Sequence, residues 1–267
     1  MPKNRKFGNC WNMDRELKNI LSEYIIHLKS KTISKDELYD FISSKKPDLN
    51  DNTFRWYISQ LKNNHILSEV KNGLYKWTNK PPFRPLINEF LVGLNDDINK
   101  AFTETKFCCW STDWLNEFSR HQTATNYYLV EIEKDMIDSV FNYLMDNTEF
   151  HVFINPDEQT LNRYIQSETD PVILKSLISR SPLTKHKISP FVINIPSLEK
   201  LIVDLFCDTE LFNYWQGEEK INIYRNILKQ YDVNFSTITS YAKRRNREKE
   251  IKDFLKVNFS HIMKELS

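Results

Sequence analysis

The spacing of apolar residues predicts a pair of helices at the start of the chain. A first helix is expected over about residues 14–29, where apolar side chains recur every three or four positions. A second begins at Ser34, because Ser34 followed by Glu37 is the signature of a capping box. It ends before Pro47, since the residue that precedes a proline is pushed out of the helical region.

A third helix, expected from about residue 51 to residue 64, has one apolar and one polar face. Its apolar stripe comprises Phe54, Tyr57, Ile58 and Leu61. Two short β-prone runs follow, residues 66–70 and 74–77, and flank Lys71-Asn72-Gly73. Asn-Gly between such runs predicts a hairpin with a type I′ turn, in which both residues adopt a positive φ. Two helices, a polar-faced third helix and a hairpin are the layout of a winged helix-turn-helix.

This layout predicts that the third helix enters the major groove of DNA, where amide and guanidinium side chains can read base edges. Lys62 and Lys71 would contact phosphates, and Asn72 would lie with Lys71 at the tip of the wing. A winged helix that serves only as a protein-binding adaptor is the alternative. The complete set of residues assigned to DNA is Asn52, Thr53, Arg55, Trp56, Ser59, Gln60, Lys62, Lys71 and Asn72.

The run Asn79-Lys80-Pro81-Pro82 is the clearest linker, because adjacent prolines continue neither a helix nor a strand ladder. We therefore predict a winged helix-turn-helix domain over residues 1–80 and a mixed α+β body with C-terminal helices over residues 83–267. The overall fold class is α+β. Strands are expected near residues 107–110, 126–133, 150–154, 172–178 and 191–195. Residues 126–133 alternate between apolar and polar positions like a half-buried strand. Helices are expected near residues 86–102, 111–118, 135–145, 157–167, 196–205, 222–230, 237–245 and 250–259.

Charge is distributed unevenly along the 267 residues. The whole chain has a net charge of +1, but residues 1–80 contain 15 Lys and Arg against 9 Asp and Glu. A basic N-terminal part followed by an acidic remainder is typical of a DNA-contacting module joined to a part that does not contact DNA broadly. No apolar run approaches the roughly 18 residues of a membrane span, and the N-terminus lacks the apolar core of a signal peptide. We therefore expect a cytoplasmic protein without membrane contact, and its four cysteines to be free thiols.

The common catalytic and cofactor motifs are missing from the sequence. With only four glycines, the chain contains neither a G-x-G-x-x-G loop nor a Walker loop. It also lacks the G-x-S-x-G and H-E-x-x-H motifs, and its six histidines are scattered. We expect no cofactor, no metal site and no enzymatic activity.

One group of charged residues favours a different function, a Mg²⁺-dependent nuclease targeted by the winged helix. Asp113, Glu131, Glu133 and Lys134 distantly resemble the acidic-acidic-lysine signature of restriction-type nucleases. That signature needs an acid two residues before the lysine, where this chain has Ile132, so the spacing is off by one. The simpler interpretation is a solvated strand end.

Further candidates for binding are a basic cluster and two tryptophans. The cluster Lys243, Arg244, Arg245 and Arg247 could bind phosphate or an acidic patch on a partner, or form a solvated helix surface. Trp56 lies on the polar face of the third helix and Trp215 in a polar stretch. Exposed tryptophans often mark contact surfaces.

The whole layout resembles the AbiEi-type antitoxins of bacterial abortive-infection toxin–antitoxin systems. The resemblance covers nearly the full length: an N-terminal winged helix, a linker, and a body with a Tyr-rich strand that ends in Val130-Glu131. It continues through Pro196-Ser197-Leu198-Glu199-Lys200, Val203-Asp204-Leu205 and Tyr241-Ala242-Lys243-Arg244-Arg245.

The resemblance implies a transcriptional repressor of its own operon. The winged helix would bind double-stranded DNA at the protein's own promoter. The body would neutralise a nucleotidyltransferase-like toxin encoded alongside, with or without a stable complex. The chain lacks the Gly-Ser and paired aspartates typical of such a toxin, so it would be the antitoxin. Neither the operator nor the oligomeric state follows from the sequence.

Overall fold

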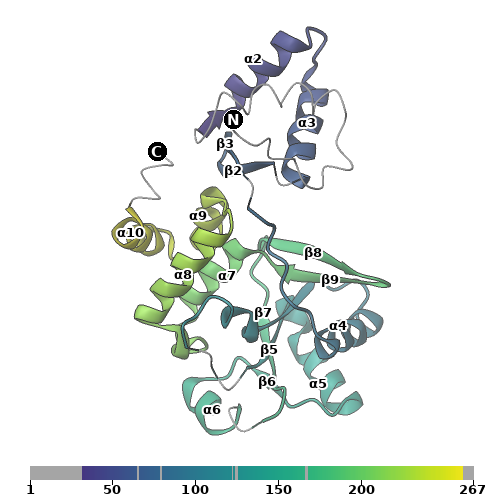
Figure 1. The fold of residues 1–267 in the computed structure, drawn as a ribbon. Coiled ribbons are helices and arrows are strands. Elements are labelled where there is room, and N and C mark those ends of the chain that lie inside the picture. The colour runs from purple at the N-terminus through teal and green to yellow at the C-terminus, as the bar shows by residue number, and fades with distance from the viewer. Residues whose placement is uncertain are drawn as a thin grey trace, which may run out of the picture. The chain divides into compact units, whose positions relative to one another are not determined.

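The computed structural model describes residues 32–260, apart from residues 65, 79, 122, 124, 125, 166 and 167 (Figure 1). The predicted first helix, residues 14–29, lies outside the described residues. Contacts divide the described chain into two units. The first unit contains the residues up to Pro82 and the segment Gln230–Ser236, and the second contains Phe83–Lys229 and the residues from Thr237 onward. Among the described helices, none combines the length and the apolar character needed to cross a membrane.

In the first unit, two helices precede a β-hairpin. Strand β1 (Thr32–Ser34) leads into α2 (Lys35–Lys45), and α3 (Asp51–Asn63) is followed by β2 (Leu67–Lys71) and β3 (Leu74–Trp77). The three strands form one antiparallel sheet in the order β1-β3-β2. This is the order of elements that the winged-helix prediction requires of these residues.

The two helices begin where their capping residues predict. The Ser34 hydroxyl accepts a hydrogen bond from the Glu37 backbone N–H, and the Glu37 carboxylate accepts one from the Ser34 N–H at 2.8 Å. The capping box is therefore confirmed. Helix α3 begins after Asn50, whose side-chain oxygen accepts a hydrogen bond from the Thr53 N–H at 2.9 Å.

Replacing Ser34 with alanine should lower the free energy of unfolding of this unit by about 1 kcal/mol, because the cap that ties off the first turn of α2 is removed. Thermal unfolding of the purified protein measures the change. Ser44→Ala is the matched control, since Ser44 is exposed in the last turn of the same helix. Equal effects of the two substitutions would contradict a capping role for Ser34.

The apolar stripe of α3 faces the core of the first unit, as its spacing predicts. Phe54, Tyr57 and Leu61 are almost completely buried, and Ile58 is buried as well. They pack in one cluster with apolar residues of α2 and the strands, including Leu38, Ile42, Leu67 and Tyr75. Tertiary packing of this stripe holds α3 with its other face in solvent.

The hairpin forms as predicted, but its turn is not type I′. Among the described residues, only Gly73 of the Asn72-Gly73 pair has a positive φ, at +72°, whereas a type I′ turn needs both. The β2–β3 register shifts between Glu69 and Lys71. Such a bulge adds local twist to the strand, so the hairpin does not depend on a type I′ turn for its twist.

The second unit is built around a four-stranded mixed sheet in the order β4-β5-β7-β6. Strand β5 pairs antiparallel with β4 and parallel with β7, and β6 also pairs parallel with β7. A separate antiparallel pair, β8-β9, lies beside β4. The strands are β4 (Phe107–Ser111), β5 (Tyr128–Ile132), β6 (Val152–Ile154), β7 (Val172–Ser176), β8 (Leu183–Ile188) and β9 (Phe191–Pro196).

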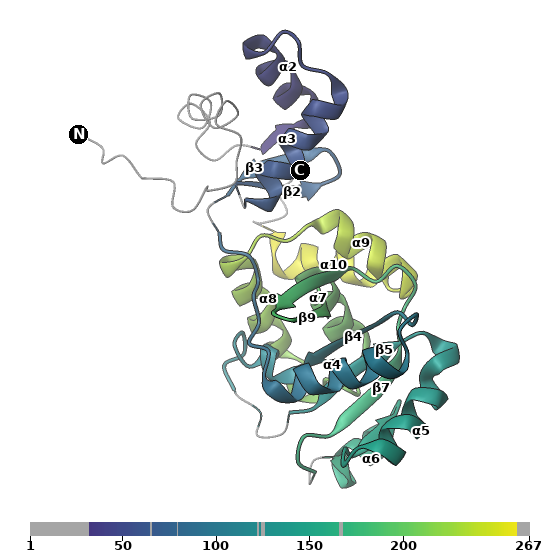
Figure 2. The same cartoon turned by 90° about the vertical axis from the view of Figure 1, so that its right-hand side faces the viewer.

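Helices cover both faces of this sheet. Figures 1 and 2 show α4 and α5 on one side, and α7 with the C-terminal helices on the other. The α-helices are α4 (Glu89–Ala101), α5 (Ile137–Asn147), α6 (Glu158–Arg163), α7 (Leu198–Cys207), α8 (Glu218–Gln230), α9 (Phe235–Arg244) and α10 (Glu248–Asn258). Short 3-10 helices cover Thr112–Leu115, Lys134–Met136 and Asn213–Trp215. The predicted mixed α+β body with C-terminal helices is confirmed.

Three details of the body differ from the sequence prediction. Strand β5 is buried at every position instead of half-buried, because it lies between two other strands and under helices on both faces. Trp215 is fully buried, so it is not an exposed contact residue, whereas Trp56 is 47% exposed. Strand β8 was not predicted; its mixed lysine, histidine and apolar residues form a strand through pairing with β9.

Candidate nucleic-acid interface and buried ion chain

The exposed face of α3 carries most of the residues that the sequence assigns to DNA. Asn52, Arg55, Trp56 and Ser59 are exposed, and Thr53 and Gln60 are partly exposed. Buried and exposed positions alternate at helical spacing, so the polar and apolar faces are separated cleanly. The helix therefore presents amide, guanidinium, hydroxyl and indole groups side by side.

Some charges on this unit are already paired. Arg55 contacts Asp51 at 2.8 Å, and Lys62 contacts Glu69 of the hairpin at 2.6 Å. The Arg55–Asp51 pair is exposed on both sides and contributes little to stability, so Arg55 can exchange partners. Because the Glu69 carboxylate also accepts a hydrogen bond from the Gly73 N–H, Lys62 and the turn are tied to the same side chain.

The hairpin tip supplies the remaining assigned residues. Lys71 and Asn72 are both exposed, and no ion pair to the Lys71 ammonium is present among the described residues. The Asn72 backbone N–H donates to the Ser236 hydroxyl, which belongs to the same unit. Lys76, by contrast, pairs with Asp232 of the segment Gln230–Ser236, and so its charge is offset.

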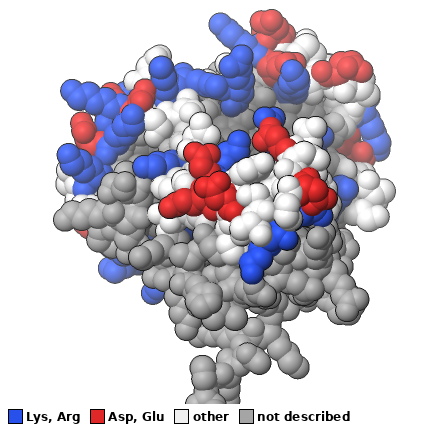
Figure 3. Space-filling view, turned by 90° about the horizontal axis from the view of Figure 1, so that it is seen from above, with Lys and Arg blue, Asp and Glu red and all other residues white. Residues whose placement is uncertain are grey.

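Positive charge on the described part of the first unit is modest. Residues 32–80 contain eight Lys and Arg against six Asp and Glu, so more of the excess over residues 1–80 lies in residues 1–31. Figure 3 shows basic and acidic side chains interleaved on the face of the molecule that it draws. Any DNA contact by α3 would thus depend on the arrangement of its polar groups more than on a uniformly basic surface.

The predicted basic cluster near the C-terminus does not form one surface. Arg244 donates to the carbonyl oxygens of Ser179 and Arg180 at 3.1 and 3.0 Å, and Arg247 pairs with Glu250. Lys243 is exposed. Arg245 was a candidate for phosphate or partner binding, but its side chain is only 14% exposed and binds two carboxylates inside the protein. Arg245, which directly follows α9, points toward the core, so its charge is not on the surface with those of its neighbours.

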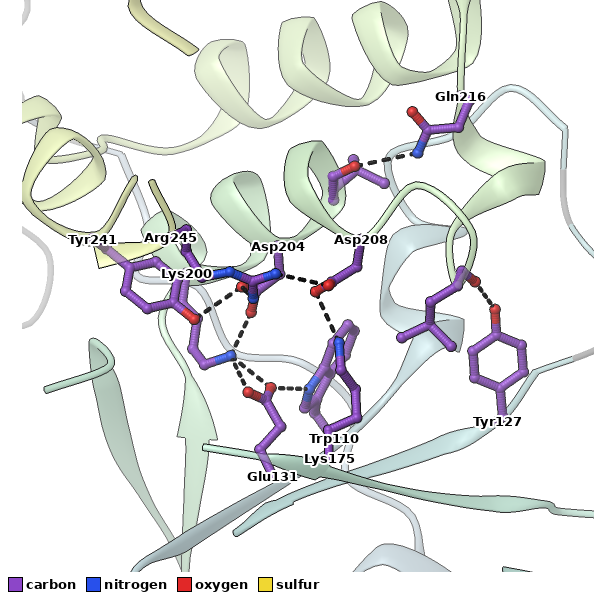
Figure 4. Close-up of polar contacts among 12 residues, drawn as sticks. Trp110, Tyr127, Glu131, Lys175, Lys200, Asp204, Asp208, Gln216, Tyr241 and Arg245 are labelled. Carbon is purple, nitrogen blue, oxygen red and sulfur yellow. Dashed lines mark hydrogen bonds and ion pairs between the residues drawn. The ribbon is translucent and has the colours of Figure 1, made fainter. Parts of the chain in front are cut away.

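Arg245 belongs to a chain of six alternating charges within the second unit, which we call the ion chain (Figure 4). Its positive members are Lys175, Lys200 and Arg245, and its negative members are Glu131, Asp204 and Asp208. The ion chain therefore contains equal numbers of positive and negative side chains. The order of contacts is Glu131, Lys200, Asp204, Arg245, Asp208 and Lys175.

The buried end of the ion chain joins α7 to the sheet. Lys200 is completely buried, and its ammonium contacts the two Glu131 carboxylate oxygens at 2.5 and 2.7 Å. It also donates to Asp204, one helical turn further along α7. Trp110 donates its indole N–H to Glu131 at 3.1 Å, and the Tyr241 hydroxyl donates to Asp204 at 2.9 Å. Buried charges are tolerated here because each has opposite charges and further hydrogen bonds.

The other end of the ion chain is more open. Arg245 donates to Asp204 at 3.0 Å and to Asp208 at 2.7 Å, and Lys175 contacts the other Asp208 oxygen at 2.8 Å. The strand register explains part of this arrangement. Glu131 of β5 lies beside Lys175 of β7, so both side chains project from the same face of the sheet toward α7.

Neighbouring charges and burial together determine the pKa values of these groups. Burial alone would lower the pKa of Lys200, but the adjacent Asp204 and Glu131 carboxylates outweigh it and raise that pKa well above its ordinary value. Burial likewise opposes ionisation of Asp208, yet Lys175 and Arg245 hold its pKa below the ordinary value. Lys200 and Asp208 are therefore charged at neutral pH. For Asp204, burial raises the pKa against the opposing effect of Lys200.

The residues of the nuclease hypothesis are not brought together. Asp113 contacts Asn116, next to the start of β5, while Glu131 lies near the other end of that strand. The register places Ser111 opposite Tyr128 and Cys108 opposite Glu131. The end of the strands next to Asp113 is therefore about 10 Å from the Glu131 position. Glu131 is also buried, so the expectation of a solvated strand end was wrong.

The other two members of that hypothesis lie at the end of β5. Glu133 accepts a hydrogen bond from the Lys106 N–H, and Lys134 begins a 3-10 helix. Within the described ranges, no group of three or more His, Cys, Asp or Glu side chains is placed to hold a metal ion.

Sequence reasoning missed the ion chain as a unit. Lys200, Asp204 and the C-cap Asp208 repeat at four-residue spacing along α7, whose remaining residues are apolar except for Glu199. This was a visible indication of a charged stripe facing inward. Glu131 in the middle of Tyr-Leu-Val-Glu-Ile was a second indication. What joins them is the packing of α7 on β5, which spacing along the chain does not reveal.

Comparison with known proteins gives a family but no activity. No curated protein matches the sequence. One family model, described as a family of unknown function, matches residues 53–261. The match begins inside α3 and continues through the hairpin and the whole sheet to α10. It includes every member of the ion chain. The protein thus belongs to DUF6577, a family of unknown function.

Proposed function

We propose that the protein is a DNA-binding transcriptional autorepressor that also acts as an antitoxin against a nucleotidyltransferase-like toxin encoded in the same operon. The observation that carries the DNA-binding half is the two-sided α3. Its apolar face is locked into the core by Phe54, Tyr57 and Leu61, and its polar face is free to enter a major groove. A hairpin with Lys71 at its tip follows immediately.

The polar face offers chemistry suited to base edges. Arg55 can donate two parallel hydrogen bonds to guanine, and Gln60 or Asn52 can pair with adenine in the same two-point manner. Trp56 adds an apolar surface for base methyl groups or sugars. Lys71 would contact the backbone and position the helix without reading sequence.

Removing Lys71 should weaken binding to all DNA sequences alike. Because Lys71→Ala would neutralise one phosphate fewer, the slope of log affinity against log salt should become shallower by about one unit. Fluorescence anisotropy with a labelled duplex over a salt series measures this slope. Lys62→Ala should change it less, because the Lys62 charge is already offset by Glu69. An unchanged slope in Lys71→Ala would remove the hairpin tip from the interface.

The positions of the AbiEi-like segments in the fold support the proposed antitoxin role. Three segments that are far apart in sequence supply Glu131, then Lys200 and Asp204, and finally Tyr241 and Arg245. All five side chains meet at the ion chain. The similarity therefore covers a connected core and not scattered surface positions, as expected if the body shares the fold of those antitoxins.

The antitoxin half is tested by co-expression. The protein should restore growth of cells that express the nucleotidyltransferase-like gene encoded beside it. A variant that folds but lacks the DNA-reading side chains, Arg55→Ala with Gln60→Ala, should still restore growth, because the proposal assigns rescue to the second unit. Toxicity that persists with correctly folded wild-type protein would contradict the antitoxin role.

A further inference from the structure

A pocket of about 350 Å³ lies in the second unit, where the exposed end of the ion chain reaches the surface. It is formed at the carboxyl ends of two adjacent parallel strands. Asn155 directly follows β6, Lys175 is near the end of β7, and Asp208 follows α7. Arg247, at the start of α10, completes the wall. In open sheets with parallel strands, this edge is the common position of ligand sites.

Six of the ten residues that line the pocket are polar or charged, and they carry both signs of charge. Lys175 and Arg247 supply positive charge, and Asp208 and Glu210 supply negative charge. Asn155 and Thr209 add an amide and a hydroxyl group. Among the described residues that line it, none is aromatic, so the pocket offers no stacking surface for a nucleobase or a flat ring.

The two helix ends at this pocket also have opposite polarity. Cys207 and Asp208 lie at the C-terminal end of α7, where the helix dipole favours a cation. Arg247 is the N-cap of α10, where the dipole favours an anion, and it makes no side-chain capping hydrogen bond. A ligand with a single charge would meet a like charge on one wall. A ligand that carries one positive and one negative charge can face an opposite charge at both helix ends.

We propose that this pocket binds a small zwitterion, a free α-amino acid or a molecule with the same paired ammonium and carboxylate groups. The carboxylate would contact Arg247, and the ammonium group would contact Glu210 near the C-terminal end of α7. A volume of about 350 Å³ is at the small end of ligand pockets, which suits a molecule of this size. This assignment does not depend on DNA binding.

Two substitutions separate the charges of the pocket without touching the ion chain. Arg247 is more than half exposed and pairs only weakly, at 3.3 Å, with exposed Glu250. Glu210 is exposed. Arg247→Met removes the proposed carboxylate partner, and Glu210→Gln removes the proposed ammonium partner. Lys252→Met is the control, because Lys252 is on the same helix as Arg247 but does not line the pocket.

The test is titration calorimetry of the full-length protein with each L-α-amino acid in turn, at up to millimolar concentration. At least one should bind. Its N-acetyl derivative and its methyl ester, which each lack one charge, should bind at least about tenfold more weakly. Each pocket variant should lose about tenfold in affinity for the free amino acid, and Lys252→Met should not.

Three results would overturn the proposal. The first is that none of the amino acids binds wild-type protein whose folding circular dichroism has verified. The second is that a blocked derivative binds as well as its free parent. The third is that both pocket variants bind the amino acid as wild type does, which would place the ligand elsewhere.

Discussion

Replacing Lys200 with methionine should lower the free energy of unfolding by about 3–5 kcal/mol. The Lys200 ammonium is completely buried between Glu131 and Asp204. Without it, two carboxylates would be left facing each other without a compensating charge. Methionine fills most of the same volume, so the expected loss of stability comes from the unpaired carboxylates and not from a cavity.

Chemical denaturation followed by tryptophan fluorescence measures this loss. Trp110, one of the six tryptophans of the chain, donates to Glu131, so part of the signal comes from a side chain in contact with the ion chain. Lys252→Met is the matched control, because Lys252 and Glu248 form an exposed pair on α10 and should contribute less than about 1 kcal/mol. If both variants were destabilised by the same small amount, the ion chain would contribute no more than an ordinary surface pair.

The pKa of Lys200 sets the sign of the pH dependence of this difference in the free energy of unfolding. The pKa of Lys200 is raised in the folded protein above its ordinary value of 10.5. Its stabilising contribution is therefore complete below the unfolded pKa and is lost only as pH rises through the folded one. The stability gap between wild type and Lys200→Met should therefore narrow in strongly alkaline solution, where the Lys200 ammonium of the wild type loses its proton.

Replacing Arg55 with alanine should weaken the sequence preference while leaving general DNA affinity nearly intact. A two-point contact to a base is worth about 1–3 kcal/mol of discrimination, or roughly 5- to 150-fold in the ratio of specific to scrambled binding. Arg55 is free to make such a contact because its pair with Asp51 is exposed on both sides. The measurement is that affinity ratio for the duplex upstream of the gene.

Two comparisons make the Arg55 result interpretable. Lys71→Ala should lower both affinities and keep their ratio, as expected for a phosphate contact. Lys45→Ala, at the exposed end of α2 and outside the assigned interface, should keep the ratio as well. If Arg55→Ala and Lys71→Ala behaved alike, the assignment of the α3 face would be wrong.

Much of the fold could be predicted from local sequence patterns, because interactions between residues close together in the sequence determine where these elements form. The capping box of Ser34 and Glu37 and the apolar stripe of α3 are set by residues within one or two helical turns. The hairpin position was also correct, since Gly73 tolerates a positive φ. The turn type was wrong because the β2–β3 register shift decides it, and that shift depends on pairing across strands.

The ion chain could not be predicted because its members meet only through tertiary packing. Alternation in β5 suggested a half-buried strand, and Glu131 was placed in solvent. Burial of both faces of that strand turned Glu131 into a core residue that needs a cation. Arg245 reads as one of a basic cluster, yet its position on the inward side of the α9 end makes it a partner of Asp204 and Asp208.

The most direct test of the proposed function is binding of the full-length protein to the DNA just upstream of its own gene, against scrambled DNA of the same length, at two salt concentrations. The proposal predicts tight retention on the upstream duplex that persists at the higher salt, while scrambled binding falls away. Equal and weak binding to both duplexes would contradict it. The polar face of α3 would then serve a protein partner, as in the adaptor alternative.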